Sequence, residues 1–198
     1  MNKYLKKIII VIIAVIYLSM LVSAVIVNVK YHKYVTVTEM DMSEEYDYEN
    51  AGFSVKLDSY KCVTPEELAG IYPYTADIVR KKETDENIEI EDIILVYADI
   101  NVYDYDTYKT ATKKGDWTLF WSIEAENGWR NNTSLDLYRT FTPNIEEGEH
   151  QYIFAYIVAK SDSYDYEKVS PKEWNYKLQI NKTPVVYYRL SKEKMVSE

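Results

Sequence analysis

The side chains most able to do chemistry gather in one short segment near the middle of the chain. Four of them carry oxygen ligands within eight residues: Asp99, Asn101, Asp104 and Asp106. Oxygen donors at this spacing suit Ca²⁺, which takes about six to eight of them. The segment lacks the glycine that lets a calcium-binding loop wrap an ion, and its first two residues fall on a predicted strand. A solvated strand end is therefore favoured, no metal or other cofactor is expected, and a calcium-dependent adhesion module stays an alternative.

Catalytic motifs are scarce. His32 follows the apolar N-terminal run and His150 begins a predicted strand, so the two histidines have no evident common site. Cys62 is the single cysteine, and a lone cysteine without a partner histidine is typical of a small buried hydrophobic residue. The chain has no G-x-S-x-G, glycine-rich phosphate loop or H-E-x-x-H sequence. The sequence predicts no enzyme and no catalytic residue, and a cell-wall glycan-acting enzyme using paired acids is the alternative.

The central segment offers recognition more readily than catalysis. Its sequence, "IEDIILVYADINVYD", alternates in the manner of a strand. Four residues share one face of this strand: Tyr97, Asp99, Asn101 and Tyr103. Two tyrosines around two short polar groups combine aromatic area with directional hydrogen bonds, so these four form the predicted binding patch. Cover by residues 71–90 is the competing interpretation, because Ile93 and Leu95 on the same face need cover.

Three of the four tryptophans lie in "WTLFWSIEAENGW", residues 117–129. Trp117 and Trp121 share a strand face with leucine and isoleucine, which predicts that both lie in the core. Trp129 follows Asn127-Gly128, a strong turn signal. We expect Trp129 to be partly exposed and include it among the binding residues.

Strand patterns dominate the chain after Gly52. Strands are predicted in these segments: 53–61, 90–104, 117–125, 134–142, 150–160 and 181–190. Residues 150–160, "HQYIFAYIVAK", are apolar on both faces, as a central sandwich strand can be. Several strands separated by turns predict a mainly β protein, namely an immunoglobulin-like antiparallel β-sandwich.

Two short helical turns are predicted between the strands. Residues 64–67, "TPEE", have a capping residue, proline at the first helical position and an acid three residues after the cap, with Gly70 as the stop. Residues 170–173, "SPKE", repeat this arrangement. Residues 71–90 have no clear period and predict a loop with a helical turn.

The N-terminal part differs sharply from the rest. Residues 1–7 contain three lysines, and residues 8–29 form an uncharged, mostly apolar run. A helix of this length spans about 33 Å, enough for the hydrocarbon core of a bilayer. We predict a cytoplasmic tail over residues 1–7, a transmembrane helix over 8–29, an acidic spacer over 30–50 and an extracytoplasmic β-sandwich over 51–198. Cleavage after Val22-Ser23-Ala24 is the competing interpretation.

The charge distribution sets orientation and partners. Lysines are more numerous before the apolar run than directly after it, which places the N-terminus in the cytoplasm and the bulk outside the cell. Residues 30–198 contain 20 basic and 32 acidic residues, a formal charge of −12. Such a domain repels phosphate backbones, so nucleic acid is not an expected partner. A single cysteine excludes an intrachain disulfide and favours a bacterial exterior.

The arrangement resembles small single-pass membrane proteins of Gram-positive bacteria with an extracytoplasmic immunoglobulin-like domain of unknown function. Four stretches carry the resemblance: "IIIVIIAVIYLSMLVSAVIVNV", "ILVYADINVYD", "PNIEEGEHQYIFAYIV" and "LQINKTPVVYYRL". In such domains a polar turn ending in Gly-Glu precedes a long strand, as Gly148-Glu149 does here. The resemblance covers residues 52–190, departs at residues 71–90, and implies a fold and a location without a reaction.

The predicted function is a membrane-anchored, non-enzymatic binding or assembly domain. Its expected partners are the lipid bilayer, through the N-terminal helix, and either another membrane protein or a cell-wall polymer.

Overall fold

The structure is a computed structural model that describes these segments of the chain: residues 16–26, 37–114, 121–141, 145–165, 169–182 and 184–196. Residues 16–26 are helical, and no helix within the described segments is long and apolar enough to cross a membrane. The rest of the predicted span over residues 8–29 lies outside the described residues. The predicted tail over residues 1–7 and Trp117 lie outside them too.

One sheet has five strands in the order β1-β9-β8-β5-β6. Their bounds are Val37–Asp41 for β1, Ser122–Ala125 for β5, Arg130–Asn132 for β6, Tyr176–Lys182 for β8 and Val185–Leu190 for β9. The pairing of β1 with β9 is parallel, and the other pairings are antiparallel. The strand predicted over residues 181–190 is present from Val185 as β9, while Asn181 and Lys182 belong to the end of β8, so two antiparallel strands occupy a segment predicted as one.

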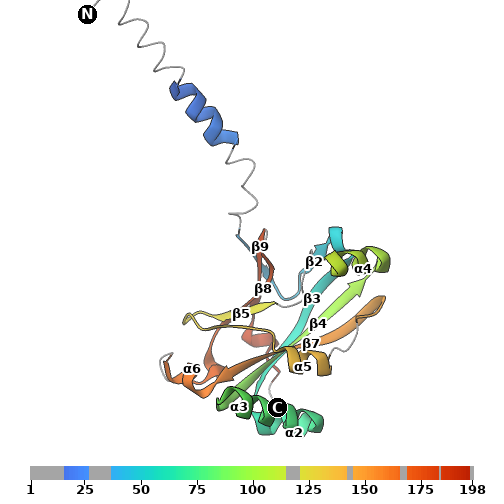
Figure 1. Ribbon diagram of the computed structural model, residues 1–198, viewed down its shortest axis with the longest axis vertical. Coiled ribbons are helices and arrows are strands. Elements are labelled where there is room, and N and C mark those ends of the chain that lie inside the picture. Colours follow the sequence, from blue (N-terminus) through green and yellow to red (C-terminus); the bar gives the residue numbers. More distant parts are fainter. Residues whose placement is uncertain are drawn as a thin grey trace, which may run out of the picture.

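The other sheet has four antiparallel strands in the order β2-β3-β4-β7. Their bounds are Glu45–Tyr48 for β2, Phe53–Val63 for β3, Ile90–Val102 for β4 and Gly148–Ala159 for β7. Figure 1 shows β3, β4 and β7 running side by side along the body of the protein. The strands β3, β4 and β7 match three segments that the sequence predicts.

The two sheets pack face to face over one hydrophobic core, because alternate residues of each strand point inward. From β3 the buried core residues include Phe53, Val55 and Leu57, and those of the five-stranded sheet include Leu178 and Tyr188. The Tyr188 hydroxyl donates a hydrogen bond across the core to the Val55 carbonyl oxygen at 2.8 Å. The predicted mainly β architecture with two sheets is confirmed.

Among the described strands, β7 pairs with β4 and lies at the edge of its sheet, which corrects the prediction of a central strand over residues 150–160. Each face of β7 packs against a different part of the protein. Phe154 packs in the core against Trp121, with ring centroids 4.4 Å apart, so the predicted core position of Trp121 is confirmed. Ala155 points to the opposite face and joins a second hydrophobic cluster.

This second cluster covers one end of the outer face of the four-stranded sheet. Ile93 of β4 contacts it from the sheet. Three helices supply the cover: Leu68 from α2 (Pro65–Ile71), Val79 from α3 (Ala76–Glu86) and Leu137 from α5 (Leu135–Phe141). Figure 1 shows α2 and α3 together at one end of the protein, with α4 (Tyr105–Lys114) near β2 at the other. The helices α2 and α3 therefore do not cover the end of the outer face that lies near α4.

Residues 71–90 contain more helix than predicted. The segment Pro73–Thr75 forms the 3-10 turn η2, and α3 follows it directly. The only large apolar residues in α3 are Ile78 and Val79, too few to produce a visible helical period. The predicted loop is therefore wrong for this segment, while its predicted role as cover for Ile93 is confirmed.

The helix α2 begins with the capping box that the sequence predicts. Thr64 Oγ1 accepts from the Glu67 backbone N–H at 3.2 Å, and the Thr64 N–H donates to Glu67 Oε2 at 2.6 Å. The helix runs through Gly70 and ends at Ile71, one residue beyond the predicted stop. The second predicted turn is the 3-10 helix η3 at Pro171–Glu173, capped by Ser170.

The predicted acidic spacer is wrong over the described part of residues 30–50. Here β1 pairs with β9 and β2 pairs with β3, so this segment belongs to the folded domain. The alternation of Glu45 and Asp47 with Tyr46 and Tyr48 is the cause, since the tyrosines pack on the core and the acids face outward. The many acidic residues of this segment therefore belong to a strand that has one face on the core and the other toward solvent.

The predicted strand over residues 134–142 is also wrong, because this segment forms α5. Leu137, Tyr138 and Phe141 pack inward at helical spacing. Leu135 and Leu137 also satisfy a period of two, which led to the strand prediction. The remaining short elements are η1 (Glu49–Ala51), α6 (Lys160–Asp165) and η4 (Lys192–Lys194).

Candidate functional site

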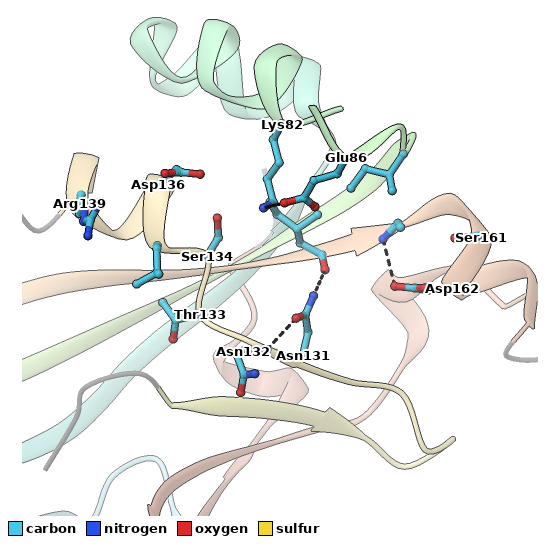
Figure 2. Close-up of a pocket in the computed structure, with 14 residues that line it drawn as sticks. Lys82, Glu86, Asn131, Asn132, Thr133, Ser134, Asp136, Arg139, Ser161 and Asp162 are labelled. Carbon is cyan, nitrogen blue, oxygen red and sulfur yellow. Dashed lines mark hydrogen bonds and ion pairs between the residues drawn. The ribbon is translucent and has the colours of Figure 1, made fainter. Parts of the chain in front are cut away.

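A groove with a volume of about 680 Å³ lies where the two sheets meet at their edges (Figure 2). We call it the α3–α5 groove. Its walls are Lys82 and Glu86 of α3, residues 131–136 and Arg139 from β6 to α5, the end of β7, and Ser161 and Asp162 of α6. A pocket of this size is within the range of about 300–1,000 Å³ that holds small ligands.

The floor of the groove is a chain segment that crosses from one sheet to the other. Asn131, in the middle of β6, donates from Nδ2 to the Ile157 carbonyl oxygen of β7 at 2.7 Å. The Ser134 N–H donates to the Ala155 carbonyl oxygen at 2.7 Å. These two bonds hold residues 131–134 against the edge of β7, so the floor is fixed by both sheets.

Ser134 differs from the other buried polar residues of the floor. Its side chain is 8% exposed, and its hydroxyl has no hydrogen-bond partner among the described residues. Figure 2 shows this hydroxyl pointing into the groove, toward the side where α3 lies. The neighbouring Thr133 hydroxyl instead donates to the Trp121 carbonyl oxygen at 3.0 Å. A buried polar group without a hydrogen-bond partner costs the folded protein about 1–3 kcal/mol of stability. The Ser134 hydroxyl is therefore the group of the groove that a hydrogen bond from a ligand would stabilise.

Charged side chains line the groove in mixed signs. Lys82 Nζ lies 2.5 Å from Glu86 Oε1. Asp162 Oδ2 accepts from Trp129 Nε1 at 3.1 Å, which holds this carboxylate against the wall. Asp136 and Arg139 lie exposed at the rim. With two bases and three acids, the groove has no strong preference for a highly charged ligand.

Groups suited to catalysis are scarce at this site. No histidine or cysteine lines the groove. Within the described residues, no three His, Cys, Asp or Glu side chains are placed to hold a metal ion. Cys62 is buried elsewhere, as predicted, and burial followed by the nearby Asp92 charge raises the pKa of its thiol, which disfavours a thiolate nucleophile. The arrangement can bind through hydrogen bonds.

The predicted binding patch is brought together on the outer face of β4, but its two ends differ. Tyr97 is half-buried against the second hydrophobic cluster, and burial, then the nearby Tyr72 hydroxyl, raise its pKa. Tyr103 is 49% exposed and donates from its hydroxyl to Asp47 Oδ1 at 2.6 Å. Desolvation of this hydroxyl, then the bond to Asp47, raise the pKa of Tyr103 to about 12. The patch is therefore covered at Tyr97 and open at Tyr103.

Asp99 and Asn101 lie between these tyrosines. Asp99 stands opposite Lys56 and Gln151 in the sheet, and its Oδ1 accepts from Gln151 Nε2 at 3.3 Å. Asn101 stands opposite Ser54 and Glu149. Both side chains are partly exposed, so they belong to the uncovered end.

The prediction for Trp129 is wrong, since its side chain is only 2% exposed. After the turn, the chain returns as β6 and the indole packs over the end of the core, 5.6 Å from Trp174 between ring centroids. Trp129 has a part at the groove nonetheless, because its Nε1 anchors Asp162.

The sequence prediction missed the groove residues between 131 and 139. The cause is the strand predicted over residues 134–142, which would have placed their side chains on two faces of a sheet. A signal was present in Thr133-Ser134 followed by Asp136, since hydroxyl residues before a helix and an acid in its first turn mark a helix start.

Searches with the whole chain find no matching family model, curated protein or solved structure. The function is therefore inferred from the geometry of the chain itself.

Proposed function

We propose that this chain is a non-enzymatic binding or assembly domain that contacts a partner through the uncovered end of its outer sheet face. The domain is an immunoglobulin-like sandwich, anchored in the cell membrane by residues 8–29 and facing outside the cytoplasm. The observation that carries the proposal is the contrast along β4, where Tyr97 is covered by helices and Tyr103 is exposed.

The uncovered end is built on four rigid strands, and we call it the open face. Seven of its members project from adjacent strands to the same side, and Tyr103 follows directly after β4 and bonds to Asp47: Glu45, Asp47, Lys56, Asp99, Asn101, Tyr103, Glu149 and Gln151. A sheet adds little backbone entropy cost when a partner binds, because its backbone is already ordered. A surface of this kind supports recognition of a macromolecule.

The charge of the open face favours one of the two expected partners. Four carboxylates stand on it against the single ammonium group of Lys56. Such a face attracts basic surfaces and repels anionic polymers. A basic segment of another membrane protein therefore fits better than an anionic cell-wall polymer.

Site-directed photo-cross-linking in cells that carry the full chain tests this proposal. We expect a cross-linking amino acid in place of Asn101 to give a discrete adduct. The same amino acid in place of Asp85, which is exposed on α3, serves as the matched control and should give none.

Charge-neutral variants sharpen the test. The double change Asp47→Asn with Glu149→Gln should reduce the adduct formed from position 101 severalfold, since long-range attraction falls with the lost charges. The control pair Asp77→Asn with Asp85→Asn changes the net charge equally and should leave the adduct unchanged. Equal adducts from positions 101 and 85, or equal effects of the two pairs, contradict the proposal.

A further inference from the structure

We propose that the α3–α5 groove is a second binding site, separate from the open face, that takes a neutral saccharide unit by a hydrogen bond to the Ser134 hydroxyl. The two sites lie on different elements, since the groove is lined by α3, α5 and α6 and the open face by β2, β3, β4 and β7.

The first argument is the unpartnered hydroxyl. Ser134 is more than nine-tenths buried, points into the groove and has no partner among the described residues. A chain that folds around such a group gains a net hydrogen bond when a ligand supplies the missing partner. A serine hydroxyl both donates and accepts, and a sugar hydroxyl does the same, so either can turn to suit the other.

The second argument is the chemistry of the surrounding groups. Ser161 is exposed on the wall and adds a second hydroxyl, while Figure 2 shows the Asn132 amide on the side of the floor away from α3. Two hydroxyl groups suit a ligand that has hydroxyl groups of its own. Leu135, 45% exposed, and Ile88 add apolar surface against which the C–H face of a sugar ring can pack.

The third argument is charge. Lys82 is already bonded to Glu86, and Asp162 accepts from the Trp129 indole. With three acids against two bases, the lining as a whole disfavours an anionic ligand, and among the described residues Arg139 at the rim is its one cation without an ion pair. A neutral ligand avoids this cost.

Calorimetric titration of the full chain with two neutral disaccharides, N,N′-diacetylchitobiose and cellobiose, tests the site. The protein is held in a detergent without a sugar headgroup, because such a headgroup would compete. We expect at least one disaccharide to bind at millimolar concentrations or below. The variant Ser134→Ala should weaken that binding about tenfold, the effect of one lost hydrogen bond.

Thermal unfolding of the free protein separates a ligand contact from a structural role. Ser134→Ala should keep or raise the melting temperature, because it removes a buried hydroxyl that has no partner. Ser122→Ala is the matched control, since Ser122 is 7% exposed but bonds to Gln179 at 3.1 Å outside the groove. This control should lower the melting temperature and leave the affinity unchanged.

Three outcomes overturn the proposal. Neither disaccharide binds at millimolar concentration, or Ser134→Ala leaves the affinity unchanged, or Ser134→Ala lowers the melting temperature as much as Ser122→Ala does, which points to a trapped water that completes the fold. Cleavage of a bound disaccharide would replace the binding role with the enzymatic one. None of these outcomes bears on cross-linking from the open face.

Discussion

The carboxyl group of Asp92 lies in surroundings that disfavour its ionised form. It lies at the start of β4, is 4% exposed, and shares the end of the core with Cys62. Burial raises the pKa of Asp92 to about 6, the Lys172 ammonium opposes the rise, and the Glu91 and Glu67 charges add to it. Lys172 itself bonds to Glu67 at 3.3 Å, so its charge is shared between two carboxylates.

This shift predicts a pH dependence of stability with a definite sign. The pKa of Asp92 is about 6 in the folded protein and about 3.9 in the unfolded chain, so the folded protein holds its proton more tightly. The stabilisation from this group is complete below about pH 4 and is lost as pH rises through about 6. We expect Asp92→Asn to raise the free energy of unfolding by about 1–2 kcal/mol at pH 7.5 and by little at pH 4.

Urea unfolding of both proteins at the two pH values measures this difference. Asp58→Asn is the control, because Asp58 is exposed on β3 and its neutralisation should give no such pH-dependent gain. A gain for Asp92→Asn that is equal at both pH values would show that packing, and not ionisation, is the cause.

Single residues also show what the sequence can and cannot predict at a site. Alternation placed Tyr97 and Tyr103 on one face correctly, because the direction of a side chain in a strand depends only on its parity. Their different exposure depends on helices far away in sequence. Trp129 was misjudged for the same reason, since its cover comes from Trp174, forty-five residues later.

At the scale of elements, the sequence predicts an element correctly where its signal is local and where only one hydrophobic period, that of a helix or that of a strand, fits the residues. The capping box at Thr64 predicts α2 because its hydrogen bonds lie within four residues. In residues 134–142 two periods coincide at Leu135 and Leu137, and the choice between them comes from the burial of Leu137 in the second hydrophobic cluster, together with Ile93 and Ala155. The groove, which depends on α5, was therefore beyond reach of the sequence.

The strands β1 and β2 give an element-scale prediction, because they lie before the expected domain boundary at residue 51. Met42 between them is 3% exposed, and the Tyr48 hydroxyl donates to the Ile180 carbonyl oxygen at 2.5 Å. A protein that begins at Ala51 should lose at least about 3 kcal/mol of unfolding free energy, as large core truncations do. A protein that begins at Val37 should keep the stability of the full chain.

Chemical denaturation of the two shortened proteins and the full chain decides this point. Tyr48→Phe in the longer protein gives a graded control, since it removes one hydrogen bond and keeps the ring. If the protein beginning at Ala51 unfolds at the same denaturant concentration as the one beginning at Val37, β1 and β2 contribute nothing to the domain.

At the scale of the whole molecule, the revised boundary shortens the segment between the domain and the predicted membrane span. The domain begins at Val37, so only residues 30–36 separate it from the predicted span over residues 8–29. An extended chain of this length reaches at most about 25 Å, much less than a spacer over residues 30–50 would. On the prediction that residues 8–29 span the membrane, a domain with a formal charge of −12 over residues 30–198 lies near the lipid headgroups, although its charge repels an anionic surface. A basic partner in the same membrane would offset that repulsion.

Location itself is the remaining prediction. The lysines of residues 1–7 and the uncharged run over residues 8–29 favour a cytoplasmic N-terminus with residues 30–198 outside. Protease added to intact protoplasts should then remove the domain while a cytoplasmic marker protein stays whole. The marker should be digested only after the membrane is permeabilised with detergent. A domain that survives until that step contradicts the orientation. A mature chain that begins at Val25 contradicts the anchor, because cleavage there would release the domain from the membrane.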